Sequence, residues 1–162
     1  MEPIVDAFLD SKDPLIPTDA VAALLVLEDG RYIMQLRDPK PNIFYPGHWG
    51  LFGGARDKNE TEVEALNREL HEELGFKPRE MSCFVRLHFD LSSIGVGQVS
   101  RAVYEISVTQ TEVSSFDLCE GLACRALTVR TILTELAVTP YDSFAIWLHY
   151  ARQRLTPPRA DL

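Results

Sequence analysis

Cysteine, long apolar runs and an excess of positive charge are scarce or absent in this chain of 162 residues. Its three cysteines, Cys83, Cys119 and Cys124, do not form the CxxC spacing of a zinc site. No stretch reaches the roughly 18 apolar residues that a membrane-spanning helix needs. Acidic residues number 24 and basic residues 16, which gives a net charge of −8. This balance argues against nucleic acid or an anionic membrane as a partner, because both favour positively charged surfaces.

The composition indicates an ordinary globular protein, and the length fits one domain spanning residues 1–162. Hydrophobic residues make up 46% and charged residues 25%. The N-terminus carries acidic residues in place of the basic start of a secretory signal, and a small odd number of cysteines fits reduced thiols. We therefore expect a cytoplasmic protein. Prolines in residues 1–18 and 156–162 predict irregular structure at both ends.

Hydrophobic patterns predict a mixed β-sheet with helices packed on it, an α/β or α+β layered fold. Strands are predicted at residues 20–27, 31–37, 49–52, 81–89, 101–108 and 122–128. Helices are predicted at residues 58–74, 129–136 and 141–154. The acidic stretch 109–119 is predicted to be a loop. Met34, Trp49, Phe84 and Trp147 are predicted to lie in the core.

The helix predicted at residues 58–74 has one apolar stripe with spacings of three and four residues. The stripe consists of Val63, Leu66, Leu70 and Leu74. Asn59 is the predicted N-cap, with Glu62 three residues later to complete a capping box. Gly75 is the predicted C-cap.

The second half of this helix carries three glutamates at neighbouring surface positions, Glu69, Glu72 and Glu73. Like charges packed this closely repel one another, and a hard divalent cation with oxygen ligands would reverse the sign of that interaction. The alternative is a solvated helix surface on which Arg68 pairs with Glu64 or Glu72. The carboxylates by themselves leave both interpretations open.

The spacing of the whole segment Gly-x5-Glu-x7-Arg-Glu-U-x-Glu-Glu-x-Gly-U, where U is apolar, resembles the signature of the Nudix hydrolases. It is matched by Gly54, Glu60, Arg68, Glu69, Leu70, Glu72, Glu73, Gly75 and Phe76. A chance match in a chain of this length has odds of about one in ten million. One departure lies upstream, where members often have Pro-Gly-Gly and this chain has Phe52-Gly53-Gly54. The resemblance implies the Nudix-type α/β/α sandwich with a mixed sheet.

The resemblance also implies a metal site. Glu69, Glu72 and Glu73 would bind Mg²⁺, for which Mn²⁺ can substitute, and the backbone carbonyl of Gly54 would be a further ligand. Arg68 would orient a glutamate through a bidentate pair. Glu60 would be structural, paired with Arg68 across two helical turns.

The activity implied by the resemblance is hydrolysis of a phosphoanhydride bond in a nucleoside diphosphate derivative. The general base would be Glu69, or a glutamate from a later loop, for which Glu120 is the candidate as base or as an extra metal ligand. The alternative for Glu120 is a solvated loop acid. The rival function is a non-catalytic Nudix domain that acts as a nucleotide sensor or a protein-interaction module. All the carboxylates of the signature are present, which favours the enzyme.

Substrate recognition is predicted less sharply. Arg37 is a candidate contact for a phosphate oxygen, with an exposed strand arginine as the alternative. Tyr45 lies in a proline-rich loop where an aromatic ring could stack on a base. A (d)NTP is the favoured substrate and a nucleotide sugar the next. The sequence does not decide which nucleotide is recognised, how many metal ions act, which phosphorus is attacked, or whether the chain forms a homodimer.

Overall fold

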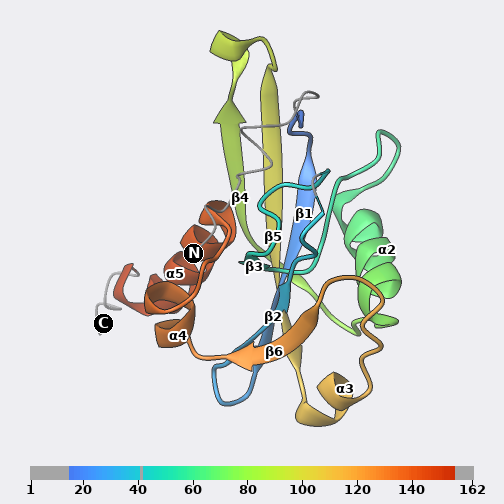
Figure 1. The fold of residues 1–162 in the computed structure, drawn as a ribbon, viewed down its shortest axis with the longest axis vertical. Helices are drawn as coiled ribbons and strands as arrows, with labels where there is room; N and C mark the ends of the chain where they lie inside the picture. The colour runs from blue at the N-terminus through green and yellow to red at the C-terminus, as the bar shows by residue number, and fades with distance from the viewer. Residues whose placement is uncertain (1–14, 41, 156–162) are drawn as a thin grey trace, which may run out of the picture.

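Six strands form one mixed sheet in this computed structural model, which describes residues 15–40 and 42–155 (Figure 1). The strands are β1 (Ala20–Leu27), β2 (Tyr32–Leu36), β3 (Trp49–Gly50), β4 (Ser82–Asp90), β5 (Gln98–Val108) and β6 (Ala123–Leu127). Their order is β3-β2-β1-β5-β4, and β6 pairs with β2. β1 and β5 are parallel, whereas the other pairs are antiparallel. The predicted mixed sheet is therefore confirmed.

Helices cover both faces of the sheet (Figure 1). They are α2 (Glu62–Leu74), α3 (Gln110–Ser114), α4 (Val129–Thr134) and α5 (Pro140–Leu155), with a 3-10 turn, η1, at Ser92–Ile94. α2 packs on one face and α4 and α5 on the other, which confirms the predicted α/β/α sandwich. Within the described ranges, no helix has the length and apolarity needed to cross a membrane. The irregular ends were predicted at residues 1–18 and 156–162. Residues 15–18 belong to no helix or strand, and residues 1–14 and 156–162 lie outside the described residues.

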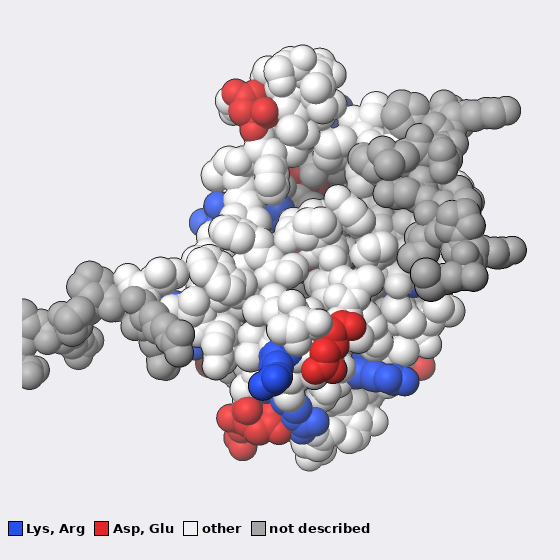
Figure 2. Space-filling model, turned by 60° about the vertical axis from the view of Figure 1, so that its left-hand side comes forward, with Lys and Arg blue, Asp and Glu red and all other residues white. Residues whose placement is uncertain are grey.

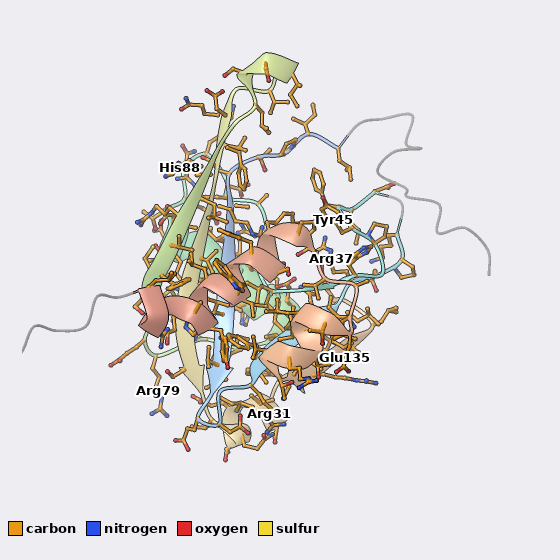
Figure 3. The ribbon with its side chains drawn as sticks, turned by 90° about the vertical axis from the view of Figure 1, so that its left-hand side faces the viewer. Arg31, Arg37, Tyr45, Arg79, His88 and Glu135 are labelled. Carbon is orange, nitrogen blue, oxygen red and sulfur yellow. The ribbon has the colours of Figure 1, made fainter. Side chains whose placement is uncertain are left out.

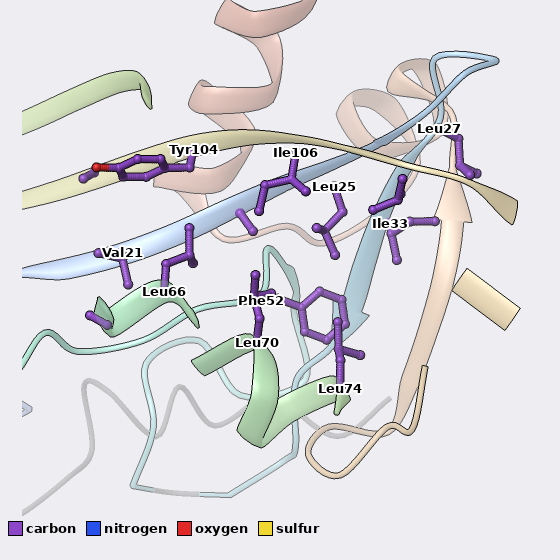
Figure 4. Close-up of a cluster of buried hydrophobic side chains, with 14 residues drawn as sticks. Val21, Leu25, Leu27, Ile33, Phe52, Leu66, Leu70, Leu74, Tyr104 and Ile106 are labelled. Carbon is purple, nitrogen blue, oxygen red and sulfur yellow. The ribbon is translucent and has the colours of Figure 1, made fainter. Parts of the chain in front are cut away.

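The central strand β1 is apolar throughout because both of its faces are buried. Alternate residues, including Val21 and Leu25, join Leu66 and Leu70 of α2 in one core cluster (Figure 4). The residues between them, such as Leu24, face α4 and α5 in a second cluster. Met34 and Trp49 are buried in the second cluster and Phe84 packs against it, as predicted.

The start of α2 differs from the prediction, because the N-cap is Thr61 and not Asn59. Thr61 Oγ1 accepts a hydrogen bond from the Glu64 N–H (3.2 Å), and the Glu64 carboxylate accepts one from the Thr61 N–H (2.8 Å). The predicted partner, Glu62, instead accepts hydrogen bonds from Arg86 and Tyr104. The sequence contains two overlapping capping patterns, Asn59 with Glu62 and Thr61 with Glu64. The tertiary contacts of Glu62 favour the pattern of Thr61 with Glu64. Gly75 ends the helix with φ of 61°, as predicted.

Three further predictions were wrong. Residues 110–114 form α3, because Thr109 and Glu112 complete a capping box that the sequence already contains. Val63 is 42% exposed, so the buried stripe of α2 consists of its other members. Trp147 is 46% exposed and stacks on Phe144, with ring centroids 5.9 Å apart, on the outer face of α5. Figure 2 views the side of the molecule that carries α4 and α5, where most of the visible surface is uncharged.

The buried His149 of α5 predicts a loss of stability in mild acid. Its Nδ1 pairs with the Tyr32 hydroxyl (2.8 Å), and its Nε2 lies against Arg152 and Glu105. Burial lowers the pKa of His149, the charge of Arg152 lowers it further, and Glu105 opposes both. Between the two pKa values the unfolded chain therefore binds the proton and the folded chain does not. The contribution of the neutral His149 to the free energy of unfolding is therefore fully present above the unfolded-state pKa of about 6.5. It decreases as the pH falls below that value.

We expect the free energy of unfolding, measured with urea at pH 7.5, 6.0 and 5.0, to fall more steeply for the wild type than for His149→Gln. The difference in slope is at most about 1.4 kcal/mol per pH unit, the limit for one proton. Equal slopes for the two proteins would contradict this assignment.

Candidate functional site

The loop that faces the acidic half of α2 is fixed against β1 by backbone hydrogen bonds. The Val21 N–H donates to the Gly54 carbonyl and the Ala23 N–H to the Phe52 carbonyl, both at 2.9 Å. Gly53 has φ of 132°, and a Cβ on it would lie 2.2 Å from the Val21 carbonyl oxygen. Only glycine fits there, so the close approach of this loop to the sheet depends on the first glycine of the Gly-Gly pair.

Glu73 is the most buried acid of the cluster, with 5% of the residue exposed. Its Oε1 accepts a hydrogen bond from Gln35 Nε2 (2.9 Å), and its Oε2 accepts one from the Gly53 N–H (2.8 Å). Burial raises the pKa of Glu73 to about 7, and the charges of Glu69 and Glu120 add to that rise. The carboxylate is thus held in one orientation in a place where its negative charge is unfavourable.

Glu69 lies beside the second glycine of the loop, with 15% of its side chain exposed. A Cβ on Gly54 would lie 2.7 Å from the carboxylate carbon and from both oxygens of Glu69. Burial raises the pKa of Glu69, whereas the hydrogen bond from Arg68 Nη1 (2.8 Å) opposes that rise. Gly54 therefore leaves the space that this carboxylate occupies.

Arg68 connects the start of the signature to its acidic cluster. Its Nε and Nη2 donate to the two oxygens of Glu60 at 2.7 and 2.9 Å, and Nη2 also donates to the Ala55 carbonyl (3.0 Å). Nη1 reaches Glu69 and, at 3.3 Å, the exposed Glu72. The Arg68–Glu60 pair was predicted, but Glu60 precedes the first turn of α2 instead of lying within it. The bidentate partner of Arg68 is therefore Glu60, and Glu69 receives a single hydrogen bond.

The loop before β6 brings Glu120 towards these acids. The Cys119 N–H donates to the Glu73 carbonyl (2.9 Å), and the Asp117 N–H donates to the Leu74 carbonyl (3.0 Å). Both bonds use carbonyls that the end of α2 leaves unpaired. The charge of Glu120 adds to the raised pKa values of Glu69 and Glu73, so this loop carries a further carboxylate near the cluster.

The donor set of this cluster suits a hard cation. Within the described part of the chain, no group of three His, Cys, Asp or Glu side chains is already arranged around a common point as a metal site. The available donors are nevertheless all oxygens. The charge of Glu69 raises the pKa of the buried Glu73, and the charge of Glu72 raises the pKa of Glu69. The Gly54 carbonyl accepts one hydrogen bond and keeps a second lone pair. A divalent cation would remove the repulsion that now raises these pKa values.

A cavity of about 400 Å³ adjoins the cluster, and Gly53 and Gly54 are part of its lining. Arg37 also lines it and donates from Nε to the Phe44 carbonyl (2.9 Å). Tyr45 is not among the lining residues, and its ring packs edge-on against Tyr141 at 5.7 Å. Figure 3 shows Arg37 and Tyr45 in the same region. A direct contact between Tyr45 and a base, as predicted, would therefore lie outside this cavity. Tyr45 contacts the cavity lining through its ring packing against Tyr141.

Three residues that contact this site were not predicted from the sequence to belong to it. Arg101 of β5 and Tyr141 of α5 line the cavity, and Gln35 holds Glu73. An arginine at the start of an apolar strand was the only sequence signal for Arg101. A second cavity, of about 460 Å³, lies among Phe76, Arg79 and neighbouring residues and contains none of the candidate site residues.

A family model described as the NUDIX domain matches residues 16–140. The chain belongs to the Nudix hydrolase family. Two curated relatives named nucleoside triphosphatase NudI share a segment of 51 residues with this Nudix chain. The protein of Enterobacter sp. (strain 638) is 39% identical there, and that of Escherichia coli O139:H28 is 41% identical. The segment spans 32% of this chain and 36% of each relative, about a third of their length.

Solved structures share the Nudix fold over most of this chain. The MutT protein of Methanosarcina mazei Go1 has a TM-score of 0.65 at 21% identity, covering 89% of this chain and 100% of that one. The Nudix domain of Shewanella oneidensis NrtR, solved with ADP-ribose, has a TM-score of 0.60 at 20% identity, covering 92% and 97%. At such identities the likeness establishes the fold alone.

Replacing Gly54 by alanine tests the contact with Glu69. The φ of Gly54 is not in the left-handed region, so the added methyl group strains no backbone and only displaces the Glu69 carboxylate. If Glu69 has the role that the family resemblance implies, turnover should fall by up to about 100-fold, the cost of a small displacement of a catalytic group, with little change in Tm. Because the methyl group acts through Glu69, adding Gly54→Ala to Glu69→Gln should cause almost no further loss. Additive losses in the double variant would contradict this coupling.

Proposed function

We propose that this chain hydrolyses a phosphoanhydride bond in a nucleoside diphosphate derivative, with Mg²⁺ as the metal ion and Mn²⁺ as a substitute. The observation that carries the proposal is the position of Gly53 and Gly54, which line the cavity and also contact the carboxylates of Glu73 and Glu69. A nucleotide in this cavity would have its phosphates next to the acidic cluster.

In this proposal Glu69, Glu72 and Glu73 hold the cation, with Glu120 and the Gly54 carbonyl as further ligands. The cation, when bound, neutralises diphosphate oxygens and lowers the pKa of a water molecule. The protein side chains would orient this water molecule and accept its proton.

Glu69 is the proposed general base, kept in place by the hydrogen bond from Arg68. Glu120 is the alternative base, since its loop is hydrogen-bonded to the end of α2. Arg37 is the proposed contact for a phosphate oxygen, because it lines the cavity and forms no ion pair with any described residue.

A (d)NTP is the first substrate to test, because the curated relatives that share the 51-residue segment are named nucleoside triphosphatases. A nucleotide sugar is the second. The rival function is a sensor that binds a nucleotide without cleaving it. The observation that supports nucleotide binding without cleavage is the structural likeness to the NrtR Nudix domain, which was solved in complex with ADP-ribose.

The deciding experiment incubates the protein with a panel of NTPs, dNTPs and nucleotide sugars in Mg²⁺, in Mn²⁺ and in EDTA, and identifies the products. We expect turnover with either metal ion and none in EDTA, with a nucleoside monophosphate and pyrophosphate as the products from an NTP. Binding of nucleotides without metal-dependent turnover across the panel would overturn the hydrolase in favour of the sensor.

A further inference from the structure

Strand β2 carries a buried amide side chain on the face that packs against α2. Gln35 is 3% exposed. Side chains alternate along a strand, so Gln35 shares a face with Ile33, which belongs to the core cluster that contains α2. An amide at such an apolar position costs free energy unless its hydrogen bonds are formed. The contacts of Gln35 therefore have to account for its presence.

The backbone and the side chain of Gln35 are both fixed in place. Its Cα pairs with Gly50 on one edge of β2 and with Cys124 on the other. A Cβ on Gly121 would lie 3.0 Å from Gln35 Oε1, so the backbone of the loop that carries Glu120 packs directly on the amide. A group held in this way by a sheet and a packed loop keeps its orientation before any ligand binds.

Both hydrogen-bond donors to the Glu73 carboxylate are neutral groups. They are Gln35 Nε2, at 2.9 Å, and the Gly53 N–H, at 2.8 Å. Glu69, by contrast, pairs with the positively charged Arg68 at 2.8 Å. No Lys, Arg or His of the described residues forms an ion pair with Glu73, and the charged groups that act on it are other glutamates. The Glu73 carboxylate is thus oriented by its donors and keeps its full negative charge.

A neutral donor and a charged donor leave different things for a metal ion. A carboxylate oxygen that accepts one hydrogen bond still has a lone pair for a cation. A guanidinium or ammonium group at the same place would form an ion pair and compete with the cation for the negative charge. An amide fixes the carboxylate without that competition, and groups that orient a metal ligand in this way typically raise metal affinity 10- to 100-fold.

We propose that Gln35 is a positioning residue, which holds Glu73 in the orientation that binds the divalent cation and leaves the charge of Glu73 available to it. Gln35 acts through Glu73 and is not itself a metal ligand. This inference rests on the proposed function, because it requires Glu73 to bind the cation.

The first test replaces Gln35 by methionine, which has a similar length and no hydrogen-bond donor. Binding of Mn²⁺ alone, without a nucleotide, is measured from the electron paramagnetic resonance signal of the free ion, so the readout does not depend on turnover. We expect the Kd for Mn²⁺ to rise about tenfold or more. An unchanged Kd in Gln35→Met would overturn the proposal.

The second test replaces Gln35 by lysine, which still offers a donor but adds a positive charge beside Glu73. We expect Gln35→Lys to bind Mn²⁺ more weakly than Gln35→Met, because the ammonium group competes with the cation. Binding as tight as that of the wild type would contradict the requirement for a neutral donor. If one of the two variants does not fold, the other decides.

Tyr32→Phe is the matched control on the same strand. Tyr32 is 2% exposed, belongs to the core cluster on the opposite face of the sheet, and pairs through its hydroxyl with His149 at 2.8 Å. This variant also loses one buried hydrogen bond of β2, so its Tm should fall, but its Kd for Mn²⁺ should equal that of the wild type. If Tyr32→Phe weakened Mn²⁺ binding as much as Gln35→Met, the effect would be general loosening of β2 and the role of Gln35 would be refuted.

These results separate the inference from the proposed function. Metal-dependent turnover together with a wild-type Kd in Gln35→Met would support the hydrolase and remove this inference. Weaker Mn²⁺ binding in Gln35→Met, in a protein that cleaves no nucleotide, would support this inference and remove the hydrolase. A wild-type protein without saturable Mn²⁺ binding would overturn both.

Discussion

Replacing Glu69 by glutamine is expected to lower turnover at least about 100-fold, the lower range for loss of a general base. The glutamine keeps an acceptor for Arg68 Nη1 but cannot take a proton from water. It also removes one negative charge from the cluster that includes Glu73, so the apparent affinity for Mg²⁺ should fall as well. Initial rates measured over a range of Mg²⁺ concentrations would separate the two effects.

The same variant should fold normally, for a reason that the structure supplies. The sequence suggests an exposed helix position, but the Glu69 side chain is largely buried. Glutamine is nevertheless tolerated there, because burial raises the pKa of Glu69 and therefore opposes its charge. We expect Tm to change by no more than about 3 °C, or roughly 1 kcal/mol. Glu135→Gln, at the end of α4, is the matched control and should keep full turnover (Figure 3). Wild-type turnover in Glu69→Gln would refute the role of Glu69 as general base and leave Glu120 as the candidate base.

Replacing Asp142 by alanine is expected to give the largest loss of stability, about 3–5 kcal/mol, because it leaves the buried charge of Arg101 unpaired. Asp142 Oδ1 accepts from Arg101, and Oδ2 accepts from the Leu51 N–H (2.9 Å) and from Thr139 Oγ1 (2.7 Å). One side chain therefore joins the start of α5 to strand β5, to the residue after β3 and to the residue before α5. Thermal unfolding should show a fall in Tm of about 10 °C or more.

An exposed ion pair provides the comparison for Asp142. Asp29 pairs with Arg31 in the turn after β1, and their side chains are 54% and 39% exposed. Asp29→Ala should lower the free energy of unfolding far less than Asp142→Ala, since solvent screens the pair. If Asp142→Ala were no less stable than Asp29→Ala, the buried pair would not be the connection described above.

Patterns within one element predicted the fold well. The strand at residues 20–27 was predicted with its observed bounds, because an apolar run buried on both faces has a clear signal. The end of α2 at Gly75 was also correct, because a glycine after the last apolar position indicates a C-cap. Errors arose where a choice depended on distant residues. Glu62 was assigned to the helix cap, whereas Arg86 and Tyr104 hold it. Trp147 was assigned to the core from its hydrophobicity, although the orientation of α5 exposes it.

In the candidate site, too, some features follow from the local sequence and others depend on distant residues. The neighbouring glutamates of α2 follow from the sequence alone, because residues three and four apart always share a helix face. Their depth of burial does not follow, since it depends on Gly53 and Gly54 lying against the helix. The approach of Glu120 depends on hydrogen bonds from its loop to the end of α2. The pairing of Arg101 with Asp142 joins residues 41 positions apart.

The sequence by itself determined the family signature, the acidic helix face and the apolar strands, because each is set by the fixed period of one helix or strand. Only the tertiary structure decided which acids are buried, which arginine is neutralised by an acid, and which arginine lines the cavity without an ion pair to any described residue. Those properties depend on the order of the strands and on the packing of α2 and α5 against opposite faces of the sheet, and no local repeat in the sequence encodes them.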